Sequence, residues 1–151
     1  MTETLKTTAE FIAEHQITMT ATRTDSNPNM ADSRDMDHWI CKFERRELTG
    51  KRYNARKDGS AVVARMQAHF SMGYGHKGAE PTAKDVLDCL ASDASSIEWD
   101  TFEAWADNMG YDSDSRKAER IYKAVERGSA KLKRFLGDAL YDALLHNTER
   151  E

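Results

Sequence analysis

The spacing of apolar residues changes once along the chain, near Phe70, and this change limits the folds open to it. Before that point apolar and polar residues alternate, which is the period of a half-buried strand. After it apolar residues recur every three or four positions, as in amphipathic helices. Because strands come first and helices follow, the sequence predicts an α+β fold, a three-stranded antiparallel sheet with helices packed on it.

One short helix precedes the expected sheet. It is predicted over Thr7–Gln16, where Thr7 followed by Glu10 has the spacing of a capping box. The segments with the alternating pattern are 17–24, 38–47 and 61–70. Each expected strand places one set of side chains toward the helices and the other toward solvent.

Three to four helices are predicted after the sheet. The first opens at Thr82, which has Asp85 three residues later as a second capping box. The N-caps expected for the others are Asp100, then Ser113 or Asp114, and then Asp138. The last segment, 138–145, is either a fourth helix or a kinked continuation of the third.

The length and composition predict one domain over 1–151 in the cytoplasm. With 151 residues the chain has the length of a single domain. No apolar run approaches the roughly 20 residues needed to span a bilayer, and the N-terminus lacks the pattern of a signal peptide. Cys41 and Cys89 do not form a CxxC pair, so reduced thiols are expected in place of structural zinc.

Charge is distributed unevenly along the chain. Residues 78–112 hold nine acidic residues and one basic residue, a net charge of −8. Residues 113–137 hold eight basic and three acidic residues, and residues 41–60 hold seven and three. This separation is typical of proteins with a charged partner, although two solvated faces of opposite sign would have the same pattern.

Two candidate binding surfaces follow from the charges. The acidic surface, expected to bind a protein, comprises Glu80, Asp85, Asp88, Asp93 and Asp107. The basic surface, expected to bind nucleic-acid phosphates, comprises Arg116, Arg120, Lys123, Arg127, Lys131 and Arg134. The first four of these cations have 4, 3, 4 spacing and share one helix face. Ion pairs with Glu119 and Glu126 within the helix are the alternative interpretation.

No catalytic constellation stands out in the sequence. Residues 73–78 have the letters GxGxxG, but the following helix begins near Thr82 and not at the third glycine, so a flexible connection is favoured. A Cys41–His69 pair is disfavoured because Cys41 shares a face with Trp39 and Phe43. A non-enzymatic protein without cofactor is therefore favoured, and enzymatic activity stays open.

Metal binding is not favoured either. His38, His69 and His76 lack the spacings of metal motifs. Asp112 and Asp114 resemble the start of a calcium loop, but its glycine and closing glutamate are missing. The sequence therefore predicts no metal site.

Several stretches resemble a family of small, mostly uncharacterised proteins of bacteriophages and integrated elements. They are SNPNM, MDHW, FSMGYGH, PTAKDVLDCLASDA, FEAWADNMGYDSDSRKAERIY and LKRFLGDALYDALL, and they span about Met19–Leu145. The resemblance implies an accessory protein of a mobile element. By analogy it implies a non-enzymatic, counter-defence inhibitor of the anti-CRISPR or anti-restriction type that binds a host protein.

Two functions are therefore expected. The first is binding of a host protein, such as a nucleic-acid-binding defence complex, in the host bacterial cell. The alternative is sequence-tolerant nucleic-acid binding through the basic C-terminal helix, by phosphate contacts.

Overall fold

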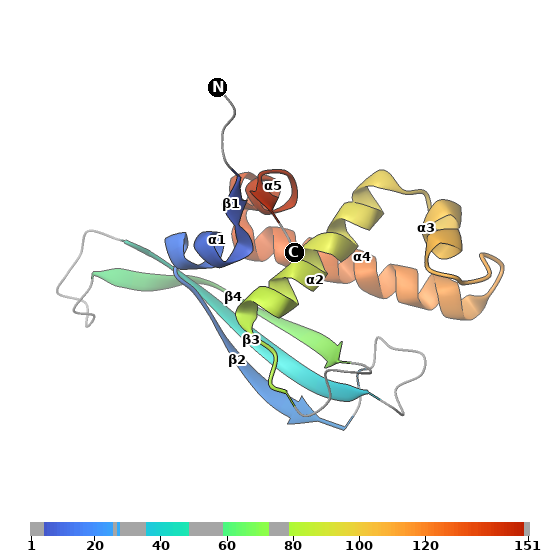
Figure 1. Ribbon diagram of the computed structural model, residues 1–151, viewed down its shortest axis with the longest axis horizontal. Coiled ribbons are helices and arrows are strands. Elements are labelled where there is room, and N and C mark those ends of the chain that lie inside the picture. Colours follow the sequence, from blue (N-terminus) through green and yellow to red (C-terminus); the bar gives the residue numbers. More distant parts are fainter. Residues whose placement is uncertain (1–4, 26, 28–35, 49–58, 73–78, 150–151) are drawn as a thin grey trace.

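Three antiparallel strands form the sheet and helices cover one of its faces (Figure 1). The computed structural model describes residues 5–25, 27, 36–48, 59–72 and 79–149. The elements in order are β1 (Lys6–Thr7), α1 (Thr8–Glu14), β2 (Ile17–Thr24), β3 (Asp37–Leu48), β4 (Ser60–Met72), α2 (Ala83–Trp99), α3 (Phe102–Asn108), α4 (Arg116–Leu136), α5 (Asp138–His146) and β5 (Thr148–Glu149). The predicted α+β fold is confirmed.

The strand order is β2-β3-β4, so β3 is central and β4 forms an edge. β2 pairs with β3 from Ile17 opposite Arg45 to Thr24 opposite His38. β3 pairs with β4 along its whole length, with a register shift between Arg45 and Arg46. The predicted alternation is confirmed, because the side chains facing the helices are buried: Ile17, Trp39, Cys41, Phe43 and Met66.

α2 contributes apolar side chains to the main core and packs against α4, α1 and α5. Its buried side chains are Val86, Leu87, Ala91 and Ala94. The predicted capping box is present, since the Thr82 hydroxyl accepts a hydrogen bond from the Asp85 amide and the Asp85 carboxylate accepts one from the Thr82 amide. The helix continues to Trp99.

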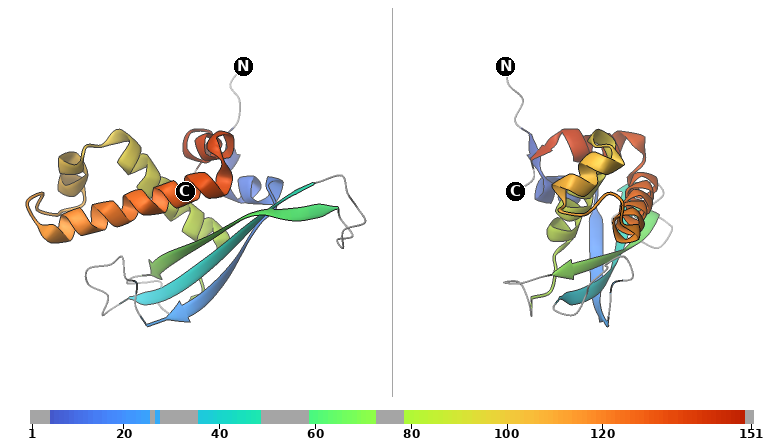
Figure 2. Two further views of the ribbon diagram at one scale, coloured as in Figure 1. Left: turned by 180° about the vertical axis from the view of Figure 1, so that it is seen from behind. Right: turned by 90° about the vertical axis from the view of Figure 1, so that its right-hand side faces the viewer.

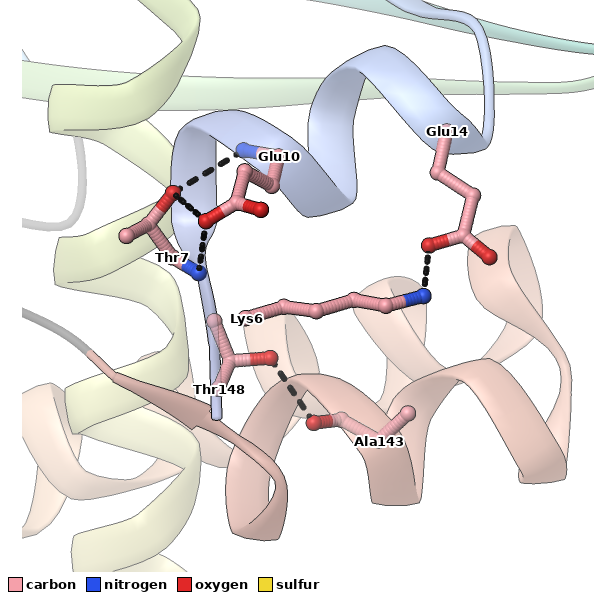
Figure 3. Close-up of polar contacts among 6 residues, drawn as sticks. All are labelled: Lys6, Thr7, Glu10, Glu14, Ala143 and Thr148. Atoms are coloured by element: carbon pink, nitrogen blue, oxygen red, sulfur yellow. Dashed lines mark hydrogen bonds and ion pairs between the residues drawn. The ribbon is translucent and has the colours of Figure 1, made fainter. Parts of the chain in front are cut away.

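Two short strands from opposite ends of the described chain, β1 and β5, pair beside α1. The predicted capping box of α1 is also present, with Thr7 Oγ1 3.1 Å from the Glu10 amide nitrogen (Figure 3). Lys6 forms an ion pair with Glu14, and Lys6 and Thr7 pair in parallel with Thr148 and Glu149. The sequence did not predict this pairing, because two-residue strands have no readable period.

Three predicted N-caps are wrong. α3 is capped by Thr101, whose hydroxyl accepts from the Ala104 amide at 3.2 Å, while Asp100 is the C-cap of α2. α4 is capped by Ser115, not by Ser113 or Asp114. Asp138 is the first residue of α5 and not its cap, which is Gly137 with φ of 80°. This left-handed backbone makes α5 a separate helix and ends α4.

A second, smaller core joins α3 to the N-terminal half of α4. Its buried members are Trp105, Ala106 and Ala118, and Phe102, Tyr111, Ile121, Tyr122 and Val125 pack around them. The Trp105 ring stacks on Tyr111 with centroids 5.8 Å apart and meets Tyr122 edge-on at 5.2 Å. Trp105 is therefore the side chain that holds α3 against α4.

Replacement of Trp105 tests this second core. Trp105 is 2% exposed, so Trp105→Ala should lower the free energy of unfolding by about 3–5 kcal/mol, through lost burial and the cavity left behind. Trp99 is 74% exposed, so Trp99→Ala should change it by no more than about 0.5 kcal/mol. Urea unfolding followed by circular dichroism measures both, and equal losses would show that α3 is not held as described.

Candidate functional site

Six cations form one continuous surface on α4, which we call the basic stripe: Arg116, Arg120, Lys123, Arg127, Lys131 and Arg134. All six are exposed. At 100° per residue they fall within an arc of about 80°, and they extend over about 27 Å of helix. The structure therefore brings together every residue of the predicted basic surface.

The apolar side of α4 explains why the stripe faces outward. Leu132, Phe135 and Leu136 are buried in the main core. The Phe135 ring lies 6.1 Å from that of Phe43, and the Phe135 carbonyl accepts a hydrogen bond from Arg45 Nε at 3.1 Å. These contacts hold the C-terminal end of α4 on the sheet, while its N-terminal part extends beyond the sheet together with α3 (Figures 1 and 2).

Within the described ranges, most charges of the basic stripe have no carboxylate partner. Lys123 pairs with Glu119 at 2.9 Å, and both side chains are exposed. Among the described residues, the other five cations form no ion pair, and Glu126 does not pair with any of them. An intrahelical ion-pair network therefore accounts for only one of the six cations in the part of the chain described.

The predicted acidic residues have different neighbours and do not make one surface. Asp85 belongs to the capping box of α2. Asp88 accepts a hydrogen bond from the Thr8 hydroxyl at 2.6 Å and pairs with Lys84 at 2.7 Å, so it links α2 to α1. Asp93 lines a pocket, as shown below, and Glu80 and Asp107 are exposed on separate segments.

A pocket of about 370 Å³ lies between β4, α2, α3 and α4. Most of its wall is apolar, and the members include Met66, Phe70, Leu90, Trp105, Ile121 and Val125. Polar residues also line it on three elements: His69 on β4, Cys89 and Asp93 on α2, and Arg127, Ser129 and Lys131 on α4. A mostly apolar hollow with a few converging polar groups is typical of ligand sites.

Burial controls the ionisation of the polar groups on α2. Burial raises the pKa of Asp93 from its ordinary value of 3.8 to about 6. The Cys89 side chain is exposed, but partial desolvation by the surrounding protein, and then the charges of Asp93 and Asp88, keep the pKa of its thiol above the ordinary value. The thiol lies 4.0 Å from the Asp93 carboxylate and stays protonated at neutral pH. This pair is therefore suited to binding and not to nucleophilic attack.

His69 lies on the β4 wall of the pocket. Burial, and then the nearby charge of Lys131, lower its pKa, so the neutral ring is favoured. Its Nδ1 is buried and has no hydrogen-bond partner in the described part of the chain. His69 is therefore a neutral, partly buried residue beside the pocket, and its Nδ1 is closed to solvent.

The structure argues against a Cys41–His69 catalytic pair. Cys41 is fully buried, and burial raises the pKa of its thiol to about 11. It lies opposite Ala68, so the next residue, His69, points to the other face of the sheet. His38 is buried with its Nδ1 2.9 Å from the Ser71 hydroxyl. His76 and the glycine-rich segment 73–78 lie outside the described residues.

Within the described ranges, no three His, Cys, Asp or Glu side chains are grouped so as to hold a metal ion. Asp112 instead accepts a hydrogen bond from the Asp114 amide, which is a local turn contact. No helix in the described part of the chain has the length and hydropathy needed to cross a membrane.

No protein-family model, curated protein or solved structure matches the chain.

The raised pKa of Asp93 predicts a pH dependence of stability. The folded protein keeps a proton on Asp93 up to about pH 6, whereas the unfolded chain releases it near 3.8. The free energy of unfolding of the wild type should therefore fall as the pH rises from 3.8 to about 6, because loss of the proton favours the unfolded chain. Asp93→Asn has no such proton, so its free energy of unfolding should not show this fall.

Urea unfolding at several pH values measures the difference. Asp107→Asn, which removes an exposed carboxylate, is the control and should follow the wild-type profile. Parallel profiles for wild type and Asp93→Asn would contradict the burial of this carboxylate.

Proposed function

We propose that this protein binds nucleic acid through the basic stripe, mainly by contacts with phosphates and without strong sequence preference. The observation that carries the proposal is the alignment of six exposed cations on one helix face, five of them without an ion pair among the described residues. Lys and Arg side chains that neutralise phosphates release counterions, and this release drives such binding.

The edge of the sheet adds to this surface. A groove between β4 and α4 is lined by Val63, Arg65 and Gln67 on the strand and by Lys131 and Arg134 on the helix. Arg65 is exposed and pairs with Glu44 at 3.2 Å. Because the groove runs beside the basic stripe, it offers polar and cationic side chains to the same strand of nucleic acid.

The overall charge of −4 is compatible with this proposal, because the charges are separated along the chain. The acidic residues of α2 and α3 lie in segments other than the basic stripe. A protein with opposite charges on different surfaces orients a charged partner during approach.

Salt dependence tests the proposal. If the six cations each neutralise a phosphate of a single strand, the logarithm of the affinity should fall against the logarithm of salt with a slope of about −4. Replacing Arg116 and Arg120 with Gln should make the slope shallower by about 1.4, since two contacts are lost. Fluorescence anisotropy with a labelled oligothymidylate measures these slopes.

The matched control replaces two exposed cations outside the stripe, Lys42 and Lys133, with Gln. It removes the same charge and should leave the slope nearly unchanged. Absence of binding at low salt, or equal effects of the two double variants, would contradict nucleic-acid binding by the basic stripe.

A second candidate function is binding of a host protein by an accessory protein of a phage or mobile element, as a counter-defence inhibitor. One observation favours it. Trp99 is 74% exposed at the end of α2, between the acidic residues Glu98 and Asp100. Exposed tryptophans are enriched among the residues that dominate protein–protein binding energy.

Pull-down from bacterial lysate tests this second candidate. Trp99→Ala should lose a partner that wild type retains, while Leu48→Ala, which truncates a side chain that is 72% exposed elsewhere, should keep it. If Trp99→Ala captures every protein that the wild type captures, Trp99 is not part of a protein-binding surface.

A further inference from the structure

The pocket and the basic stripe share residues. Arg127 and Lys131 belong to the stripe and also line the pocket. A strand whose phosphates lie along the stripe therefore has its bases beside the pocket. Bases of single strands, unlike those of duplexes, are free to turn into such a hollow and stack on its walls.

The wall chemistry suits a planar aromatic ring with hydrogen-bond donors on its edge. Phe70 and Tyr111, which are half-buried, contribute aromatic surface. Asp93 contributes a carboxylate, which repels phosphate and accepts hydrogen bonds. Guanine presents two adjacent donors, N1–H and the N2 amino group, on its Watson–Crick edge, and a carboxylate can accept both. The other three bases do not present adjacent donors there.

Gly128 provides a separate observation at the same place. It lies in the interior of α4, where glycine destabilises a helix relative to alanine. A Cβ atom built on Gly128 would have no atom within 4 Å, so no close packing requires glycine there. Gly128 lines the pocket, so the absence of a side chain keeps the space open.

We infer that the pocket receives one unpaired base of a single-stranded nucleic acid and prefers guanine, whose N1–H and N2 amino group donate to the Asp93 carboxylate. This inference rests on the nucleic-acid binding proposed above: the stripe holds the phosphates and the pocket selects the base. Asp93 is a specificity residue in this arrangement, while Gly128 keeps the entrance free.

Three twelve-nucleotide probes test the inference by fluorescence anisotropy. The first is oligothymidylate, the second carries one central guanine, and the third carries hypoxanthine, which lacks the N2 amino group, in its place. Wild type should bind the guanine probe about tenfold more tightly than oligothymidylate, with hypoxanthine between them. The measurement is repeated with ribose oligomers, which present the same base edges.

Variants separate the pocket from the stripe. Asp93→Asn should reduce the guanine preference to about twofold or less. Gly128→Leu should abolish the preference by filling the pocket. Gly128→Ala is the matched control at the same position, and it should keep most of the preference while stabilising the helix.

The outcomes distinguish the two proposals. Equal affinity of wild type for all three probes, or a guanine preference that survives in both Asp93→Asn and Gly128→Leu, overturns the base pocket and leaves binding by the stripe intact. Failure of wild type to bind any probe at low salt overturns both. Thermal unfolding of each variant shows whether a lost preference reflects a lost fold.

Discussion

The burial of the C-terminal end of α4 on the sheet is the contact on which the rest of the molecule depends. Leu132, Phe135 and Leu136 enter the main core, and Arg45 donates to the Phe135 carbonyl from the central strand. A helix of 21 residues is about 31 Å long, so anchoring only its end leaves the remainder beyond the sheet. α3 covers the apolar side of that remainder, the basic stripe occupies the exposed side, and the pocket lies where α4 departs from β4.

Much of this fold is readable from local patterns. The alternation in Ile17–Thr24 and the capping boxes at Thr7 and Thr82 each depend on residues close in sequence, and all are present in the structure. The caps of α3 and α4 were misplaced because residues suited to capping stand side by side there, as in Asp100 and Thr101. The path of the backbone decides which of the two side chains accepts a hydrogen bond from a free amide at the start of the helix. The pairing of β1 with β5 depends on the distant ends of the chain meeting, which no local pattern reports.

Part of the candidate site was likewise predictable from local sequence patterns, and part was not. Helical spacing alone placed the first four cations, 116 to 127, on one face, because they belong to one element, and the structure adds Lys131 and Arg134 to that face. The five acidic residues come from three segments, and only packing shows that Asp88 binds Thr8 while Asp93 faces the pocket. The pocket itself is made by four elements and was not predicted. Gly128 weakens its helix, and its position on the pocket wall gives that weakness a reason.

The most direct test of this account is to map the binding surface residue by residue. Amide chemical shifts of ¹⁵N-labelled protein, recorded during titration with oligothymidylate at low salt, locate the contacts without any substitution. The account predicts that the largest shifts lie in 116–134 of α4 and in 65–69 of β4, and that added salt reverses them. Absence of shifts, or shifts confined to α1, α5 and the strands other than β4, would contradict it.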